Sequence, residues 1–286
     1  MKPRLILIEG LPGSGKSTIA QWVHEILSDA GIESEIFLEG NLDHPADYEG
    51  VAFYNKDEFQ SLISKNMEFE VELKAWVKKQ ESDYFIPYRK MQNELGIRFP
   101  GELLNTICKN DIYELPFSQN QKLIIEKWIM FGREAIRGNK TYIFECCFIQ
   151  NPVTIGMIKY DIPAEDIIQY VTRLEDAIKV LHPIIIYIDQ EDIEFTFKKA
   201  VCERPSEWSK GFIDYYTDQG YGKSQALTGL DGTIQILQAR RVLETEIYKR
   251  LKINKMRVDN SRYDKKCKDE LKKMNFFPEK TRQGDC

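Results

Sequence analysis

The sequence predicts an α/β fold, with a five-stranded, mostly parallel sheet between two layers of helices. Two observations lead to this prediction. Short continuous apolar runs alternate along the chain with longer segments whose apolar residues recur at helical spacing. In addition, a strand, a helix and a second strand follow one another within residues 5–40, which is typical of a βαβ unit. Of the 286 residues, 42% are hydrophobic, so the chain can bury a sizeable core.

The N-terminal unit can be followed residue by residue. Leu5–Ile8 is continuously apolar, as expected for a strand buried on both faces of a parallel sheet. Apolar residues then recur at helical spacing over residues 19–27, and Gly31 ends that helix. The second predicted strand is Ser34–Gly40.

Residues 55–120 interrupt the alternation. The segment is rich in aromatic and charged residues, and Phe69, Leu73, Trp76 and Val77 recur at helical spacing. We interpret it as a helical insertion over an acceptor site, whose aromatic residues form its own core rather than a surface for stacking bases. The predicted organisation is therefore a main domain over residues 1–262, this insertion within it, and a C-terminal tail over residues 263–286.

The alternation resumes after the insertion and completes the predicted sheet. The further predicted elements are a helix over residues 121–137, the strand Thr141–Glu145, a helix from near Pro163, the strand Pro183–Asp189, a helix over residues 191–202, a loop over Glu203–Gly211, two more helical stretches and the strand Ile253–Asn260.

A phosphate-binding motif lies between the first strand and the first helix. Gly10, Gly15, Lys16 and Ser17 satisfy the pattern G-x-x-x-x-G-K-[ST], and the preceding strand and following helix are its expected context. Glycines let main-chain N–H groups surround phosphate oxygens, and the helix N-terminus adds its positive dipole end. Lys16 is predicted to reach the β- and γ-phosphates of ATP, and Ser17 to bind Mg²⁺. The predicted nucleotide-binding residues are Gly10, Leu11, Pro12, Gly13, Ser14, Gly15, Lys16, Ser17 and Thr18.

The motif alone does not name the reaction, because phosphate loops occur in switches, motors and kinases. A GTPase switch needs an N-K-x-D motif late in the chain, whereas "NKDE" at Asn55–Glu58 lies early and "NKMR" at Asn254–Arg257 lacks the aspartate. Ring-forming ATPases usually carry paired acids at the end of a strand, and Glu145 and Asp189 are each single.

Three stretches resemble thymidylate kinases and the related deoxynucleoside kinases. They are "LILIEGLPGSGKST", "HPIIIYIDQEDIEFTFKKAVCERP" and "MRVDNS", and the similarity covers roughly residues 1–45 and 140–260. The resemblance implies a P-loop NTPase fold with strand order 2-3-1-4-5, ATP on the loop, and an acceptor beside strands 2 and 3. It also implies an ATP- and Mg²⁺-dependent kinase.

The resemblance suggests roles for further residues. Glu145 occupies the position of an acid that accepts the proton of the attacking hydroxyl or holds a magnesium-bound water. Arg204 lies where a lid arginine of these kinases contacts the transferring phosphoryl group, with Lys198 and Lys199 behind it. Asp189 is expected to cap the following helix rather than to bind a metal.

The acceptor site departs from the family pattern. Gly40 replaces a proline after Glu39, and Cys146 replaces an arginine after Glu145. We expect three polar clusters near the acceptor, because ligands of open α/β sheets bind at the carboxyl ends of the strands. The clusters are Glu39, Asn41, Asp43 and His44; Glu145, Gln150 and Asn151; and Arg89, Arg98 and Arg133. The first is acidic and rich in amides, which favours an acceptor with hydroxyls or an amine. His44 is interpreted as a hydrogen-bonded loop residue rather than a base.

Composition restricts the partners. The net charge of −5 does not favour nucleic acid or an anionic membrane, and no run of about 18 apolar residues is present. The six cysteines form no metal-spaced cluster, which predicts reduced thiols in a cytoplasmic protein, with Cys146 and Cys147 as small apolar residues. The leading prediction is a kinase that phosphorylates a small molecule, with a nucleoside or nucleotide as first candidate. A regulatory ATPase whose insertion docks a protein, a nucleic-acid end kinase, and a homodimer remain open.

Overall fold

The structure is a computed structural model, and it describes residues 2–264 and 266–273. The chain divides into two compact units. The first unit combines the residues up to Glu39 with those from Trp128 onward, and the second is Gly40–Lys127. The predicted insertion over residues 55–120 falls inside the second unit, which is longer at both ends.

A five-stranded sheet forms the centre of the first unit, and every pair of neighbouring strands in it is parallel. Its strands are β1 (Leu5–Gly10), β2 (Ser34–Phe37), β6 (Thr141–Glu145), β7 (Ile184–Asp189) and β8 (Asn254–Asp259). The predicted α/β class with a five-stranded parallel sheet is therefore confirmed. The order is β2-β6-β1-β7-β8. These numbers differ from the predicted 2-3-1-4-5 because three further strands, β3 to β5, form a separate sheet in the second unit.

The helices of the first unit cover both faces of this sheet. They are α1 (Lys16–Asp29), α6 (Phe117–Ala135, from Trp128 onward), α7 (Gln150–Val153), the π-helix η3 (Thr154–Lys159), α8 (Ala164–Ile178), the 3₁₀ turn η4 (Lys179–Leu181), α9 (Ile193–Glu203), α10 (Ser206–Thr217), α11 (Gly220–Ser224), α12 (Gly229–Arg250) and α13 (Lys266–Lys273).

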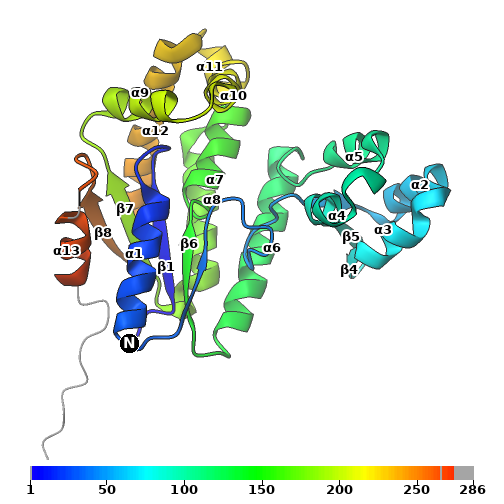
Figure 1. Cartoon of the computed structure of the whole chain (residues 1–286), viewed down its shortest axis with the longest axis horizontal. Helices are drawn as coiled ribbons and strands as arrows, with labels where there is room; N and C mark the ends of the chain where they lie inside the picture. Colours follow the sequence, from blue (N-terminus) through cyan, green and yellow to red (C-terminus); the bar gives the residue numbers. More distant parts are fainter. Residues whose placement is uncertain (1, 265, 274–286) are drawn as a thin grey trace, which may run out of the picture. The chain divides into compact units, whose positions relative to one another are not determined.

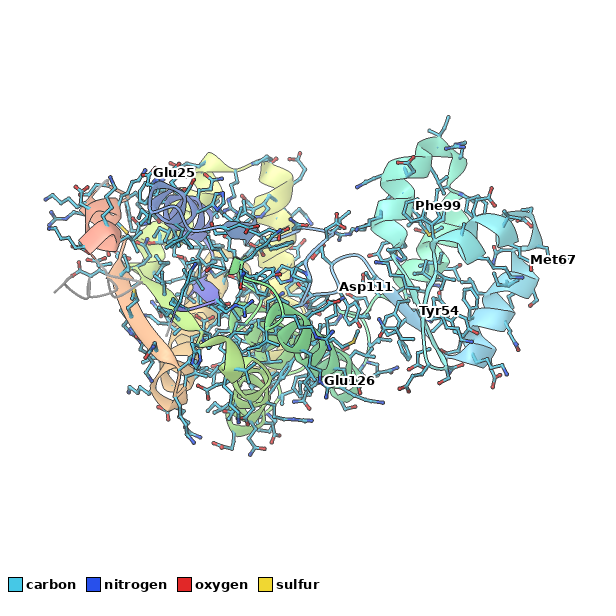
Figure 2. All side chains as sticks on the ribbon, turned by 90° about the horizontal axis from the view of Figure 1, so that it is seen from below. Glu25, Tyr54, Met67, Phe99, Asp111 and Glu126 are labelled. Carbon is cyan, nitrogen blue, oxygen red and sulfur yellow. The ribbon has the colours of Figure 1, made fainter. Side chains whose placement is uncertain are left out.

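Alternate strand residues point to opposite faces, and this alternation builds a three-layer unit. Ile8 and Ile186 pack on one face with Val23 of α1 and Leu271 of α13. Figure 2, in which Glu25 marks α1, shows α1 and α13 on the same side of the sheet. On the other face, Phe144 of β6 contacts the rings of Trp128 and Phe131 of α6, and Tyr187 of β7 contacts Tyr248 of α12. Figure 1 shows the strands running between these helices.

The second unit contains a small antiparallel sheet in addition to helices. Its elements are β3 (Ala52–Tyr54), α2 (Lys56–Lys65), η1 (Met67–Phe69), α3 (Glu70–Trp76), β4 (Lys78–Gln80), β5 (Asp83–Ile86), α4 (Tyr88–Leu95), η2 (Gly96–Arg98), α5 (Gly101–Cys108) and the first part of α6. The sheet order is β3-β5-β4. The sequence analysis does not predict these strands, because each has only three or four residues and β4 is the polar run Lys78–Gln80.

Aromatic residues form much of the core of the second unit. Phe59, Phe69, Tyr88 and Phe99 are buried in one cluster with aliphatic residues of α3, α4 and α5. The rings of Phe59 and Tyr84 stack with their centroids 4.4 Å apart. Figure 2 labels Phe99 within this unit, and also Met67, which is 71% exposed. The prediction that these aromatics form a core is confirmed.

Two predicted elements differ from the structure. The second strand ends at Phe37, not at Gly40. The predicted loop Glu203–Gly211 is mostly helical, because α9 continues to Glu203 and α10 begins at Ser206. Pro205 lies between them, and proline ends one helix and suits the start of the next because it has no N–H to donate.

The C-terminal tail is described only in part. Cys267 and Leu271 of α13 are buried in the core beneath the sheet. The remainder of the predicted tail, residues 274–286, lies outside the described residues. Within the described part of the chain, no helix has both the length and the apolar character needed to span a bilayer.

Candidate functional site

The loop between β1 and α1 has a backbone that only glycine adopts readily at its two ends. Gly10 has φ +146°, and a Cβ atom there would lie 2.6 Å from the carbonyl oxygen of Ile188. Gly15 caps α1 in a left-handed conformation, and a Cβ there would lie 2.5 Å from Nδ2 of Asn260. Both glycines of the motif are therefore required by close packing as well as by φ.

Side chains from distant segments hold the loop in this conformation. The Ser14 carbonyl accepts hydrogen bonds from Asn260 Nδ2 at 2.8 Å and from Gln190 Nε2 at 3.2 Å. The Gly13 carbonyl accepts one from the Tyr263 hydroxyl at 2.9 Å. These contacts fix the loop from the ends of β7 and β8, so its shape depends on the whole sheet and not on the motif alone.

Lys16, the first residue of α1, is the one charged residue between Gly10 and Thr18, and it is buried. Its side chain is 5% exposed, and Nζ donates to the Leu11 carbonyl at 3.0 Å. Burial by itself lowers the pKa of a lysine, but the neighbouring groups Cys146, Glu39, Glu145 and Glu9 raise the pKa of Lys16 above its ordinary value. The ammonium is therefore charged at neutral pH and is surrounded by acidic groups.

A chain of hydrogen bonds connects Ser17 to the ends of β2 and β6. The Ser17 hydroxyl donates to Glu145 Oε1 at 2.7 Å, and the Glu39 N–H donates to Glu145 Oε2 at 3.2 Å. Gln150 Nε2 donates to Glu39 Oε1 at 3.1 Å. The structure thus brings together Ser17, Glu145, Glu39 and Gln150, four residues that the sequence analysis assigned separately to a metal, a base and an acceptor.

The same cluster contains a group of potential metal ligands. One atom each of Glu39, Glu145 and Cys146 lie within 4.8 Å of one another. Cys146 is buried with φ +69°, and burial raises the pKa of its thiol well above its ordinary value. A protonated thiol is a poor ligand, so the carboxylates are the groups in this cluster suited to a hard cation. Cys146 and Cys147 are both buried, and neither is in a disulfide within the described residues, as predicted for small apolar residues.

Glu9 lies beneath the loop and is fully buried. Its two carboxylate oxygens accept hydrogen bonds from the main-chain N–H groups of Phe148 and Gln150 at 2.8 and 2.9 Å. Burial raises the pKa of Glu9 from 4.5 to about 7, and the main-chain hydrogen bonds partly oppose this. Glu9 therefore fixes the turn after β6, from which Gln150 reaches Glu39.

A second buried polar cluster lies directly behind Gln150. Arg240 of α12 has no exposed surface. Its guanidinium donates to Glu244 Oε1 at 2.6 Å, the Tyr216 hydroxyl at 2.6 Å, Thr154 Oγ1 at 2.9 Å and the Gln150 carbonyl at 3.0 Å. Glu244 also accepts from the Tyr187 hydroxyl at 2.6 Å. Thr154 begins the π-helix η3, an irregularity that is often found near functional sites.

Sequence reasoning missed Arg240 and Glu244, although a signal was present. Ile236, Leu243 and Ile247 mark the buried face of α12, and Arg240 and Glu244 occupy positions on that same face. A charged pair at spacing i, i+4 on an apolar helix face indicates a buried ion pair.

Several predicted residues have other contacts. Asp189 does not cap the next helix. It forms ion pairs with Arg257 at 2.8 Å and Arg241 at 3.8 Å, while Asp192 is the N-cap of α9 and accepts from the Phe195 N–H. The prediction for Asp189 was wrong because two arginines compete with the helix for its carboxylate.

The predicted lid cations lie on the surface of α9 and at its end. Arg204 is exposed, and its guanidinium lies 4.1 Å from the centre of the Trp208 ring. Lys198 is paired with Glu194, and Lys199 with Glu203. Lys199 Nζ also lies 4.7 Å from the centre of the Tyr263 ring, whose hydroxyl binds Gly13. Lys199 is therefore connected through Tyr263 to Gly13 of the loop between β1 and α1.

Three residues of the first predicted acceptor cluster, Asn41, Asp43 and His44, belong to the second unit. Asn41 Oδ1 accepts from the Asp43 N–H at 2.8 Å, and Asp43 is paired with Lys90. His44 is buried, its Nδ1 accepts from the Ala46 N–H, and burial and Lys127 lower its pKa to about 3. The hydrogen bond agrees with the prediction that His44 is a hydrogen-bonded loop residue.

The remaining predicted acceptor residues divide between the two units. In the first unit, Arg133 is exposed, and the Asn151 N–H donates to the Cys146 carbonyl at 3.0 Å. In the second unit, Arg98 is exposed and Arg89 is paired with Glu49. Comparisons with known proteins add nothing to this description, since no protein-family model and no curated protein significantly matches the chain.

Proposed function

We propose that the chain is an ATP- and Mg²⁺-dependent kinase with a P-loop NTPase fold, which transfers the γ-phosphoryl group to a small-molecule acceptor. One observation carries the proposal: the buried ammonium of Lys16 and the Ser17 hydroxyl, bonded to Glu145 at 2.7 Å, meet at the carboxyl ends of β1 and β6. A cation, a hydroxyl and a carboxylate at the start of a glycine-bounded helix are the groups that phosphoryl transfer requires.

The loop residues have defined tasks in this proposal. Main-chain N–H groups between Gly10 and Thr18 bind phosphate oxygens, assisted by the N-terminus of α1. An ammonium has three donors, of which the Leu11 carbonyl accepts one. Lys16 therefore has donors for the β- and γ-phosphates and neutralises charge that develops there. Its burial strengthens this interaction, because the effective dielectric is lower away from water.

The residues around Ser17 suit Mg²⁺, which prefers oxygen ligands. Ser17 and Glu145 supply a hydroxyl and a carboxylate, and Oε1 of the buried Gln150 amide has no hydrogen-bond partner in the described part of the chain. Ser17 would bind the ion directly, and Glu145 would hold a water molecule bound to it. When bound, Mg²⁺ offsets negative charge on the β- and γ-phosphates.

Transfer to an acceptor hydroxyl needs a proton acceptor. The hydroxyl oxygen forms a bond to the γ-phosphorus while the bond from that phosphorus to the bridging oxygen breaks, and ADP leaves. We assign the proton to Glu145, which is held in place by Ser17 and the Glu39 N–H. Glu39 and Gln150 hold the acceptor, and Lys199 or Arg204 supplies a lid cation. A nucleoside or nucleotide remains the first candidate acceptor, and the proposal places the protein in the cytoplasm.

Acceptor-dependent ADP release tests the proposal. The full chain is incubated with ATP, Mg²⁺ and single members of a panel of nucleosides, nucleotides, sugars and aminoglycosides, and ADP and the phosphorylated product are measured. We expect one class of acceptor to stimulate ADP release with matching product. We expect Lys16→Ala and Ser17→Ala to lower turnover by about 10²-fold or more, because each removes a group that acts on transition-state charge.

Ser28→Ala is the matched control for Ser17→Ala, since Ser28 is exposed near the end of the same helix. Its turnover should equal that of the unchanged protein. ADP release that no acceptor stimulates, with no phosphorylated product, would refute the kinase and favour a regulatory ATPase.

A further inference from the structure

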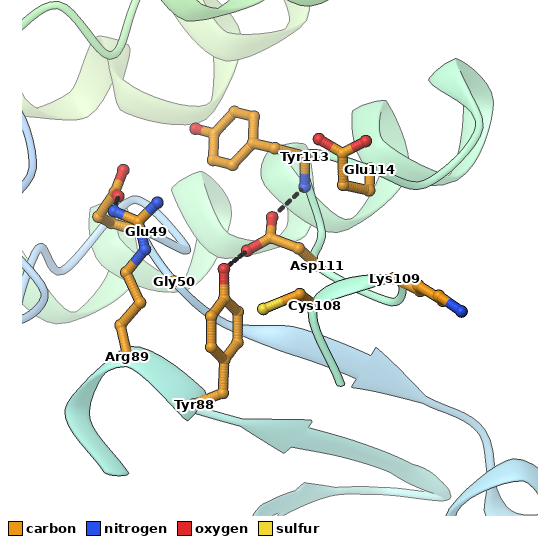
Figure 3. A pocket seen from close by; sticks show the side chains of 9 residues that line it. All are labelled: Glu49, Gly50, Tyr88, Arg89, Cys108, Lys109, Asp111, Tyr113 and Glu114. Atoms are coloured by element: carbon orange, nitrogen blue, oxygen red, sulfur yellow. Dashed lines mark hydrogen bonds and ion pairs between the residues drawn. The ribbon is translucent and has the colours of Figure 1, made fainter. Parts of the chain in front are cut away.

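The second unit contains a cavity of about 520 Å³. Its wall combines residues from three places in the unit: Glu49 and Gly50 before β3, Tyr88 and Arg89 at the start of α4, and a segment from Cys108 at the end of α5 through Asp111 to Glu114 (Figure 3). This volume is in the range of small-molecule sites. Every lining residue belongs to Gly40–Lys127, so the cavity is a property of this unit by itself.

Asp111 is the central polar group of the cavity. It is 8% exposed, Oδ2 accepts from the Tyr88 hydroxyl at 2.7 Å, and Oδ1 accepts from the Tyr113 N–H at 2.8 Å. Burial raises the pKa of Asp111 above its ordinary value, and the Tyr88 hydrogen bond opposes this. Because a carboxylate has about four acceptor positions, each oxygen can accept a further hydrogen bond. The buried carboxylate is therefore an oriented acceptor.

Arg89 supplies hydrogen-bond donors to the same cavity as the Asp111 carboxylate. Arg89 is paired with Glu49 at 2.5 Å, and it also interacts with the Tyr88 hydroxyl. A guanidinium has five N–H donors in a planar fork, so these contacts use only part of its capacity. Figure 3 shows Arg89 and Asp111 on either side of the Tyr88 hydroxyl. The wall thus presents a donor fork and a carboxylate on either side of the Tyr88 hydroxyl, together with the rings of Tyr88 and Tyr113.

The charges of the wall restrict the ligand. Glu49, Asp111 and Glu114 are acidic, while Arg89 and Lys109 are basic. Both signs are present and neither dominates, so the wall offers no concentrated positive field for a polyphosphate. A neutral ligand whose groups both donate and accept hydrogen bonds satisfies the donor fork and the carboxylate together. Two hydroxyls on neighbouring carbons have this property, and the rings of Tyr88 and Tyr113 can cover the apolar C–H face of a sugar.

We propose that this cavity binds an uncharged sugar ring through a pair of neighbouring hydroxyls, which accept hydrogen bonds from Arg89 and donate to Asp111. The ring is a ribosyl group or a hexose, since the two share this diol. The cavity belongs to the second unit and the loop between β1 and α1 to the first, and this inference does not rest on the proposed kinase activity.

Cys108 provides a direct measurement of occupancy. Its thiol lines the cavity and is partly buried, whereas the thiol of Cys202 on α9 is exposed and lies in the first unit. The full chain is treated with N-ethylmaleimide, and the modification rate of each cysteine is read by peptide mass spectrometry. The probes are methyl β-D-ribofuranoside, its 2-deoxy analogue, methyl β-D-glucopyranoside and putrescine.

We expect a diol probe at about four times its Kd to slow Cys108 modification about fivefold, because one fifth of the sites then remain open. The Cys202 rate should not change. Protection by the ribofuranoside and not by its 2-deoxy analogue identifies a ribosyl ligand, and stronger protection by the glucopyranoside identifies a hexose. Both outcomes support the proposal.

Arg89→Gln should abolish the protection, and Arg98→Gln is its matched control because Arg98 is an exposed arginine of the same unit outside the cavity wall. Circular dichroism checks that both variants are folded. Protection by putrescine alone, equal protection by the 2-deoxy analogue, protection that survives Arg89→Gln, or no protection by any probe would overturn the proposal. Lys16→Ala should keep the protection, which separates this result from any failure of the kinase assay.

Discussion

Replacing Arg240 with methionine should destabilise the first unit more than any change at its surface. Methionine has a similar length and no charge, so the substitution removes four hydrogen bonds of the guanidinium with little loss of volume. Glu244, which has no exposed surface, would keep only the Tyr187 hydroxyl as a hydrogen-bond donor among the described residues. The Gln150 carbonyl behind the glycine-bounded loop would lose one donor and keep the Thr154 hydroxyl at 2.7 Å.

The expected cost follows from this burial. Removing one partner of a buried ion pair typically costs about 3–5 kcal/mol, because the other charge stays buried without compensation. For a domain of 150–250 residues, about 1 kcal/mol corresponds to roughly 2–4 °C in Tm, so we expect Tm to fall by about 6–20 °C. The double variant Arg240→Met with Glu244→Leu leaves no buried charge and should recover part of this loss.

Urea unfolding followed by far-ultraviolet circular dichroism, together with thermal scans, measures the effect. Arg241→Met is the matched control, because Arg241 is the next residue on α12, is 33% exposed, and forms a 3.8 Å ion pair with Asp189. A surface pair of this kind contributes at most about 1 kcal/mol. If Arg240→Met unfolds within about 1 kcal/mol of Arg241→Met, the argument from the buried network is wrong.

Two further predictions concern the loop and its support. The pKa of Glu9 in the folded protein is about 7, against 4.5 as its ordinary value, so the folded state favours the protonated form. The contribution of protonated Glu9 to the free energy of unfolding is complete below pH 4.5. It is lost as the pH rises through 7, by about 3 kcal/mol in total. Denaturant unfolding between pH 4 and 8 should show this decline relative to Glu9→Gln, whose amide does not titrate, and parallel profiles would contradict it. Gly10→Ala should lower Tm and nucleotide binding, since its Cβ would meet a carbonyl oxygen of β7 at 2.6 Å. Gly211→Ala, in a helix with open space around it, should be neutral or stabilising by up to about 1 kcal/mol.

The main features of the sheet could be predicted because they depend on local pattern. Leu5–Ile8 and Pro183–Asp189 contain short continuous apolar runs, which are typical of strands buried on both faces of a parallel sheet. The strands of the second unit could not be predicted in this way. Lys78–Gln80 is polar, and it becomes a strand only because Asp83–Ile86 pairs with it.

In the candidate site, too, some residues could be predicted from local sequence and others only from the tertiary structure. The motif located Lys16 and Ser17, because phosphate binding requires fixed residue types at a fixed spacing. The carboxylate that Ser17 contacts could be named from resemblance, but the hydrogen bonds among Glu145, Glu39 and Gln150 depend on the register of β2, β6 and β1. Asp189 was assigned to the wrong partner because Arg257 reaches it from β8, a neighbour that is distant in the sequence.

By itself, the sequence determined the α/β class, the glycine-bounded loop, and Lys16 and Ser17 as its polar residues, since apolar periodicity and motif spacing are local properties of the chain. Only the tertiary structure decided what supports that loop. Arg240, Glu9 and Asn260 act through contacts between segments far apart in the sequence. Such contacts arise because a buried polar group must find a partner wherever the fold provides one, and no local pattern records where that is.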